Sequence, residues 1–308
     1  MNTIKYVHDR LLDNITKKVV GKQDTITKAI VTLLCKGHLL LDDVPGTAKT
    51  TLAKSIAQSI GCTFKRVQCT PDLLPSDVTG IYYYNQKTGE FILRKGSVFT
   101  DILLADEINR STPRTQSSLL ECMEERQVSI DGNTYSLSET FYVIATQNPI
   151  ESFGMYPLPT AQLDRFLMCL SIGYPNRQAE ESILNQYTTQ VTNQPLQEVV
   201  SIQEVLMAQQ ELATIQVSKE VRGYILDLVQ ATRDSQNIEL GISTRGAIAI
   251  MRASQGMAGV KGRTYVIPED VVSIFEDVVA HRIVLKDSTI NNTHEVTKQI
   301  LHSVSVPK

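Results

Sequence analysis

A short strand, a loop, a Lys-Thr pair and a helix follow one another near the start of the chain, and this order constrains the fold more than any other feature. Residues 38–41 form an apolar run, the loop ends at Lys49 and Thr50, and a helical pattern continues over residues 51–60. This layout cradles phosphate groups, because backbone N–H groups of the loop and of the helix N-terminus face the ligand. Lys49 would reach the β- and γ-phosphates of ATP or ADP, and the Thr50 hydroxyl would bind Mg²⁺.

The loop departs from the strict pattern GxxxxGK[ST]. Asp43 and Ala48 occupy the two glycine positions of that pattern, and Gly46 remains between them. A Lys-Thr pair at a helix start also has a plain interpretation as a solvated first turn, so the loop needs support from a second motif. The residues expected to contact the nucleotide are Val44, Pro45, Gly46, Thr47, Ala48, Lys49, Thr50 and Thr51.

The second motif is an apolar strand that ends in two adjacent carboxylates, Asp106 and Glu107. Two acids at a buried strand end are costly unless they meet a cation or perform chemistry. We expect Asp106 to hold Mg²⁺, usually through water, and Glu107 to orient and deprotonate the water that attacks the γ-phosphate. Together the two motifs predict a Mg²⁺-dependent ATPase.

Composition is typical of a soluble globular protein. The chain has 308 residues, 42% of them hydrophobic and 20% charged, which is enough for a substantial core and two domains. No apolar run approaches the roughly 20 residues of a membrane helix, and the first residues lack the hydrophobic region of a signal peptide. The cysteines are odd in number and lack CxxC spacing, which favours reduced core residues in a cytoplasmic protein over metal ligands or disulfides. They are Cys35, Cys62, Cys69, Cys122 and Cys169.

The charge balance bears on the class of partner. Lys and Arg number 30 and Asp and Glu number 33, a net charge of −3, and the chain has no long basic block. Proteins that track nucleic acid usually carry a basic stripe, so a nucleic-acid partner is disfavoured. A nucleic-acid partner remains an alternative if a basic pore lies inside the otherwise neutral protein.

Short apolar strands alternate with helical patterns up to about residue 172, which predicts an α/β domain with a parallel sheet and helices on both faces. Ligands bind such sheets at the carboxyl ends of the strands, where Lys49, Asp106 and Asn148 all fall. The predicted strands cover residues 38–41, 63–68, 102–105, 140–146 and 166–172.

Two β-hairpins interrupt this alternation. They cover residues 81–93 and 127–137, and the second contains an Asp-Gly turn between alternating residues. The three tyrosines at positions 82–84 suit either ordinary strand packing or contact with a partner or substrate.

The pattern changes to helices alone after residue 173. Ser201 and Glu204 form a capping box, and Ser243 can cap a later helix. The sequence therefore predicts a nucleotide-binding core over residues 1–173 and a small all-α domain over residues 174–308.

Several segments match strings of one known family: VVGK (19–22), VPGTAKT (44–50), TPDLLPSD (70–77), LADEINR (104–110), ATQNPI (145–150), YPLP (156–159) and AQLDRF (161–166). On these strings, which are specific in combination, the chain resembles the MoxR family of bacterial AAA+ ATPases, and the resemblance covers nearly the whole chain. The resemblance implies an AAA+ P-loop core with β-hairpin insertions, followed by a helical lid. Ala48 fits the family, whereas Asp43 stands where Gly is usual and is expected to place a carboxylate near the phosphates.

The resemblance also implies roles for three polar residues. Asn148 resembles the sensor that hydrogen-bonds the γ-phosphate or the attacking water, with a turn-capping Asn as the alternative. Arg165 resembles the arginine finger that acts in a neighbouring subunit's site, and a surface pair with Asp164 is its alternative. Arg245 resembles the second sensor, acting on its own or on a neighbouring nucleotide, and a buried or capping Arg is the alternative.

Weaker assignments follow from the same resemblance. Val20 and Gly21 resemble the adenine-side wall, although Val20 could be plain core. Arg110 is an alternative arginine finger, and Arg114 is a weaker one.

The leading functional prediction is a ring-forming ATPase, a hexamer by resemblance, that remodels, matures or activates a protein complex. The MoxR resemblance implies chaperone-like work on a protein client, often with a von Willebrand factor A-domain partner. A nucleic-acid motor related to replicative helicases is the first alternative. A low-turnover nucleotide-dependent switch is the second, and the Asp43 carboxylate is the feature that favours it.

Overall fold

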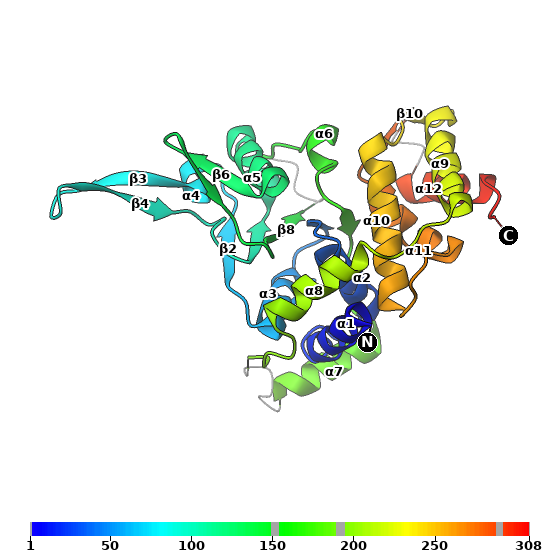
Figure 1. Ribbon diagram of the computed structural model, residues 1–308, viewed down its shortest axis with the longest axis horizontal. Helices are drawn as coiled ribbons and strands as arrows, with labels where there is room; N and C mark the ends of the chain where they lie inside the picture. The colour runs from blue at the N-terminus through cyan, green and yellow to red at the C-terminus, as the bar shows by residue number, and fades with distance from the viewer. Residues whose placement is uncertain (1, 149–153, 189–194, 288–291, 308) are drawn as a thin grey trace.

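The computed structural model describes residues 2–148, 154–188, 195–287 and 292–307 (Figure 1). Its centre is a five-stranded sheet whose strands are, in spatial order, β2 (Phe64–Gln68), β5 (Ile102–Asp106), β8 (Tyr142–Gln147), β1 (Leu39–Asp42) and β9 (Met168–Leu170). Every neighbouring pair in this sheet runs parallel. The predicted parallel sheet is therefore confirmed, and each strand forms where the apolar runs indicate.

Helices cover both faces of this sheet, with α1 (Thr3–Ile15), α2 (Gln23–Leu34) and α3 (Lys49–Ile60) on one face and α5 (Pro113–Glu125) on the other. Successive strand residues point to opposite faces, so β1 contributes to two cores. Leu39 and Leu41 pack with the first group of helices, whereas Leu40 packs with α5. The four strands β5, β8, β1 and β9 are mostly apolar because both of their faces are buried, whereas the edge strand β2 carries the polar residues Lys65, Arg66 and Gln68.

Both predicted hairpins are confirmed, as β3 (Gly80–Asn85) with β4 (Glu90–Lys95) and β6 (Gln127–Ile130) with β7 (Asn133–Ser136). The first projects from the body of the molecule beyond α4 (Pro75–Thr79), as Figure 1 shows. The Tyr82 hydroxyl shares a hydrogen bond with the Tyr135 hydroxyl of β7, which joins the hairpins. Tyr83 and Tyr84 are exposed, so the three tyrosines divide between packing and free surface.

The C-terminal part is mainly helical, and its helices are α7 (Arg177–Thr188), α8 (Ile202–Leu212), α9 (Lys219–Asp234), α10 (Thr244–Val260), α11 (Pro268–Val279) and α12 (Thr293–Ser303). The Ser201–Glu204 capping box and the Ser243 cap both form. The expectation of helices alone is wrong in one respect, because β10 (Ile238–Leu240) and β11 (Val284–Leu285) pair antiparallel. Strands this short carry too few residues for a periodic pattern. Within the described ranges, no helix is long and apolar enough to span a membrane.

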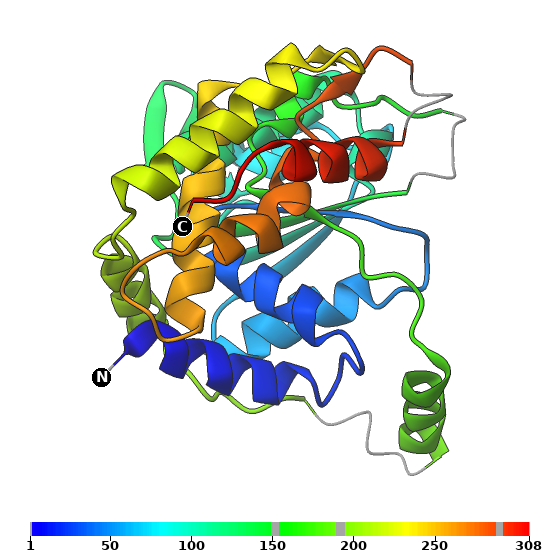
Figure 2. The ribbon, with the colours of Figure 1, turned by 90° about the vertical axis from the view of Figure 1, so that its right-hand side faces the viewer.

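The N-terminal and C-terminal helices share one hydrophobic core. Helices α1 and α2 pack against α8 and α10, and Figure 2 shows the yellow-orange α10 reaching the blue N-terminal helices. A methyl group on Gly256 of α10 would lie 2.6 Å from Val31 Cγ1 of α2, so glycine is required for this close approach. The division of the chain at residue 174 stays a prediction.

All five cysteines are free thiols, and Cys35, Cys69 and Cys122 are buried. Burial raises the pKa of each cysteine to about 12. The thiolate is the reactive form, so these side chains behave as small apolar residues at neutral pH.

Candidate functional site

The loop between β1 and α3 turns sharply at two positions. Gly46 has φ 86° and Ala48 has φ 64°, both in the left-handed region. Ala48 sits there at a cost of about 1–2 kcal/mol, and strain of this kind persists where the surrounding structure fixes the backbone. The turn at Ala48 lets α3 begin directly at Lys49, so that the helix N-terminus faces the end of the sheet.

A cavity of about 380 Å³ lies at the carboxyl ends of β1, β5 and β8. Its lining brings the separate sequence motifs together: Pro45, Gly46, Thr47, Ala48, Lys49, Thr50, Thr51, Asp106, Glu107 and Asn148. They meet because the three strands are parallel neighbours, so that the residues that follow each strand reach the same edge of the sheet. Asn148, next after β8, is only 4% exposed.

The Lys49 ammonium folds back onto its own loop. Its Nζ donates to the carbonyl oxygen of Asp43 at 2.5 Å and to that of Val44 at 3.1 Å. Val44 also accepts a hydrogen bond from the Thr47 hydroxyl at 3.0 Å. An ammonium has three donors, so Lys49 can hold the loop and also meet an anion in the cavity.

The Asp43 side chain points away from this cavity. Its Oδ1 accepts from Val44 N at 2.8 Å, and its Oδ2 accepts from Ile172 N at 2.8 Å and from Gly173 N at 2.7 Å. The expectation that it places a carboxylate near the phosphates is therefore wrong. The buried carboxylate instead satisfies backbone N–H groups where the chain leaves β9, and unpaired groups there would be costly.

Asp43→Ala is expected to lower the free energy of unfolding by about 2–4 kcal/mol, because each orphaned buried donor costs about 1–3 kcal/mol. Urea unfolding measures the change. Asp42→Ala, at the neighbouring exposed position, is the matched control. Equal midpoints for the two variants would contradict the anchoring role of the Asp43 carboxylate.

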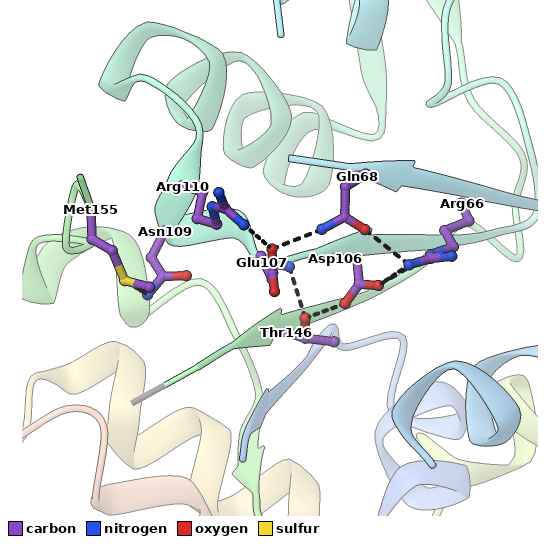
Figure 3. A network of polar contacts seen from close by, with 8 residues as sticks. All are labelled: Arg66, Gln68, Asp106, Glu107, Asn109, Arg110, Thr146 and Met155. Atoms are coloured by element: carbon purple, nitrogen blue, oxygen red, sulfur yellow. Dashed lines mark hydrogen bonds and ion pairs between the residues drawn. The ribbon is translucent and has the colours of Figure 1, made fainter. Parts of the chain in front are cut away.

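The acidic pair is organised by the neighbouring strands (Figure 3). Asp106 Oδ1 accepts from the Thr146 hydroxyl at 2.7 Å, and its Oδ2 accepts from Arg66 Nη2 at 2.7 Å. The same hydroxyl accepts from Glu107 N at 2.8 Å. Thr146 is fully buried, so this threonine of β8 fixes both residues at the end of β5.

Glu107 adopts a left-handed backbone with φ 57° before the short 3₁₀ helix η1 (Ile108–Arg110). Its Oε2 accepts from Gln68 Nε2 at 2.8 Å and from Arg110 Nη1 at 3.0 Å (Figure 3). The Arg110 side chain is 41% exposed, so this pair contributes little stability and is easily exchanged. Arg110, an alternative arginine finger by sequence, thus lies beside the Glu107 of its own chain.

Sequence reasoning missed Arg66, Gln68 and Thr146. Arg66 and Gln68 lie on one face of β2, the edge strand beside β5, and they are joined by a hydrogen bond of 2.9 Å. The sequence signal for Arg66 and Gln68 was their two-residue spacing, which places both side chains on the same face of a strand. Knowing that this face meets Glu107 requires the order of the strands.

The donor set at this cavity fits Mg²⁺. Thr50 and Asp106 both line it and offer a hydroxyl and a carboxylate. Mg²⁺ typically takes one or two carboxylates, with waters and phosphate oxygens completing its shell. The described residues include no group of three or more His, Cys, Asp or Glu side chains placed to hold a metal.

Arg165 and Arg245 lie away from this cavity. Arg165 precedes β9, whose Met168 is in register with Leu39 at the start of β1, so Arg165 lies at the amino ends of the strands. Both arginines contact Glu124 near the end of α5, Arg165 through Nε at 3.1 Å and Arg245 through Nη2. Both also line a second cavity, of about 360 Å³. The structure brings the two arginines together near the amino ends of the strands, whereas Lys49 lies at the carboxyl ends.

Gly21, which follows Val20, lies beside α7. A methyl group on Gly21 would lie 2.9 Å from Ala179 Cβ, and Lys22 Nζ donates to the Tyr174 carbonyl oxygen at 2.8 Å. Neither Val20 nor Gly21 belongs to the described lining of the 380 Å³ cavity. The structure therefore places the predicted adenine-side wall next to the first helix after the sheet, outside the phosphate end of the site.

Comparison with known proteins agrees with this architecture. Residues 38–168 match the ATPase family associated with various cellular activities (AAA), and residues 230–303 match the AAA lid domain. A crystal structure of a candidate ATPase from Cytophaga hutchinsonii superposes with a TM-score of 0.91 at 38% identity, covering 99% of this chain and 97% of that one. The fold is thus an AAA ATPase core with a lid.

Two curated relatives span almost the whole chain. The uncharacterized protein YeaC of Bacillus subtilis is 42% identical over 97% of this chain and 94% of its own length. The chaperone MoxR1 of Mycobacterium tuberculosis is 38% identical over 97% of this chain and 82% of its own length. With the two matched domains and the cavity shared by Lys49, Asp106 and Glu107, they show that the chain belongs to the MoxR family of AAA+ ATPases.

Proposed function

We propose that the protein hydrolyses ATP with Mg²⁺ at the 380 Å³ cavity and uses the energy for chaperone-like remodelling of a protein complex. The observation that carries the proposal is the convergence of Lys49, Asp106, Glu107 and Asn148 on one cavity. A phosphate-binding helix start, a carboxylate for a metal and a second carboxylate for water are the parts that phosphoryl transfer to water requires.

Each residue has a distinct task. Lys49 and the N–H groups of the loop bind the phosphates, and Asn148 orients the γ-phosphate or the water. Glu107 accepts the proton of the attacking water on a carboxylate whose Oε2 accepts from Gln68 and Arg110. Thr50 and Asp106 would hold Mg²⁺, which when bound neutralises charge on the phosphate oxygens.

The site is completed by a second copy of the chain. Arg165 lies at the amino ends of the strands, opposite to Lys49, and Arg245 meets it at Glu124, so neither arginine lies beside the nucleotide cavity of its own chain. Both side chains are partly exposed, at 29% and 50%, and are available to a neighbour. We assign both to the neighbouring subunit's site, in a ring that is hexameric by resemblance.

The remodelling role rests on the family. The relative from Mycobacterium tuberculosis is named a chaperone, and the MoxR resemblance implies a protein client and a von Willebrand factor A-domain partner. The cysteine pattern supports work in the cytoplasm. The low-turnover switch loses its support, because the Asp43 carboxylate that favoured it is directed at Ile172 and Gly173.

The steady-state ATPase rate as a function of protein concentration tests the proposal. With Mg²⁺ present, specific activity should rise with concentration, because the site is completed between subunits, and chelation of Mg²⁺ should abolish it. Lys49→Ala supplies the background rate. Appreciable activity in a dilute sample that sizes as a monomer would contradict the shared site, and ATP binding without any turnover would contradict hydrolysis.

A further inference from the structure

The turn that carries Arg165 comprises residues 164–167 and is here called the finger turn. It connects the short helix α6 (Thr160–Leu163) to β9 and belongs to neither element. The conformation of the turn therefore depends on the hydrogen bonds that its carbonyl oxygens accept. Those contacts come from the C-terminal part of the chain.

Arg282, three residues after the end of α11, binds the finger turn at several atoms, and its side chain is only 3% exposed. Its Nε donates to Asp164 Oδ1 at 2.7 Å, and its Nη2 donates to the Phe166 carbonyl oxygen at 2.5 Å. Its Nη1 donates to the Leu167 carbonyl oxygen at 3.2 Å. One guanidinium thus holds residues on both sides of Arg165.

A second lid residue reaches the same carboxylate. Asp164 Oδ2 accepts from the Ser243 hydroxyl at 3.1 Å, and Ser243 also caps α10 by accepting from Gly246 N at 3.1 Å. Arg245 follows two residues later in the first turn of that helix. Asp164 therefore joins the finger turn to the start of α10 as well as to the end of α11.

A buried guanidinium is costly unless its donors are satisfied, and five N–H groups in a rigid fork make Arg suited to several acceptors at once. Most of the acceptors here lie on one irregular turn, and Nη1 also donates to the Val278 carbonyl oxygen of α11. We propose that Arg282 is a positioning residue that fixes the finger turn against the lid and so directs Arg165 into the neighbouring subunit's site. The inference rests on the proposed action of Arg165 in a neighbouring site.

This connection has a mechanical consequence. Arg282 and Ser243 belong to the lid, whereas Arg165 belongs to the core, so a change in the lid's position moves the turn that carries the arginine. The lid of one subunit would thereby adjust hydrolysis in the next subunit rather than in its own.

Arg282→Lys tests the role while keeping the buried charge beside Asp164. Lysine can meet one or two acceptors but lacks the fork that holds three residues. We expect kcat to fall by about tenfold or more, because a displacement on the order of 1 Å can cost about 100-fold in rate. ATP affinity, measured with a labelled nucleotide, should stay within about twofold of the unsubstituted protein, because Lys49 and its loop are untouched.

Mixed assemblies separate positioning from a general loss of structure. Lys49→Ala subunits retain Arg165 and Arg282 but have a disabled phosphate loop. Co-assembled with Arg282→Lys subunits, they supply a well-placed arginine to the intact Arg282→Lys sites. Turnover per Arg282→Lys subunit should therefore rise with the share of Lys49→Ala subunits, and an Arg165→Ala variant should show the same recovery.

Each outcome bears on a different statement. Recovery of both variants supports the inference. Full activity of Arg282→Lys, or a loss without recovery while Arg165→Ala recovers, overturns the inference and leaves the shared site standing. An Arg165→Ala variant that keeps its turnover, or does not recover in the mixture, overturns the action in the neighbouring site on which the inference rests.

Arg222→Lys is the matched control, since Arg222 is an exposed arginine of the lid helix α9. It should leave both turnover and thermal unfolding unchanged. If Arg282→Lys does not fold, Asp164→Asn removes the charge and leaves one acceptor oxygen where Arg282 and Ser243 use two, and it is carried through the same mixing experiment.

Discussion

Glu107→Gln is expected to bind ATP normally and to reduce turnover by about 10²–10⁴-fold, because the amide cannot accept the proton of the attacking water. The change keeps the size of the side chain and an oxygen that can still accept from Gln68 or Arg110. The pair with Arg110 is exposed, so folding stability should hardly change. Single-turnover phosphate release measures the hydrolysis rate, and binding of a labelled nucleotide measures the affinity for ATP.

The matched control is Glu121→Gln, which changes the charge equally on the exposed face of α5. It should hydrolyse ATP at the unsubstituted rate. Hydrolysis at that rate by Glu107→Gln would mean that another group activates the water. Loss of ATP binding would mean that Glu107 contributes to the ground state instead of to the chemical step.

Lys49→Ala is expected to weaken ATP binding by at least about tenfold, which corresponds to about 1.4 kcal/mol. The reason is the loss of a charge-assisted contact with phosphate oxygens that no other side chain lining the cavity can supply, since Lys49 is the one cation among them in the described structure. The chain contains no Trp, so a labelled nucleotide or calorimetry is needed to follow binding.

Lys54→Ala provides the comparison at an exposed position of the same helix, and it should bind ATP as the unsubstituted protein does. Equal affinities for Lys49→Ala and Lys54→Ala would show that the loop does not bind the phosphates. A general defect in α3 would instead weaken both variants and would appear as a lower unfolding midpoint in both.

The sequence allowed the sheet and its hairpins to be predicted, because apolar runs, a Lys-Thr helix start and an Asp-Gly turn are local signals. It also allowed Lys49, Asp106 and Asn148 to be grouped, since the carboxyl ends of parallel strands share an edge. The β10–β11 pair was missed, because two or three residues cannot establish a period.

Residues whose importance depends on strand order or on distant partners could not be predicted. Gln68 meets Glu107 because β2 lies beside β5, and Thr146 meets Asp106 because β8 lies on the other side. No local pattern fixes that order. The direction of the Asp43 side chain depends on Ile172 and Gly173, more than a hundred residues away, and only the folded chain shows that it turns from the cavity.

Lys49 lies at the carboxyl ends of the strands and Arg165 at their amino ends, and this placement restricts the symmetry of an oligomer in which subunits share a site. In a two-fold dimer every contact of one residue with another occurs twice, so Lys49 of each copy meets Arg165 of the other only where the two sheets lie side by side and antiparallel. A heterologous, head-to-tail contact, as in the proposed ring, completes each site without reversing the sheets. An open chain of subunits always ends in one incomplete site, and only cyclic closure makes the number of complete sites equal to the number of subunits.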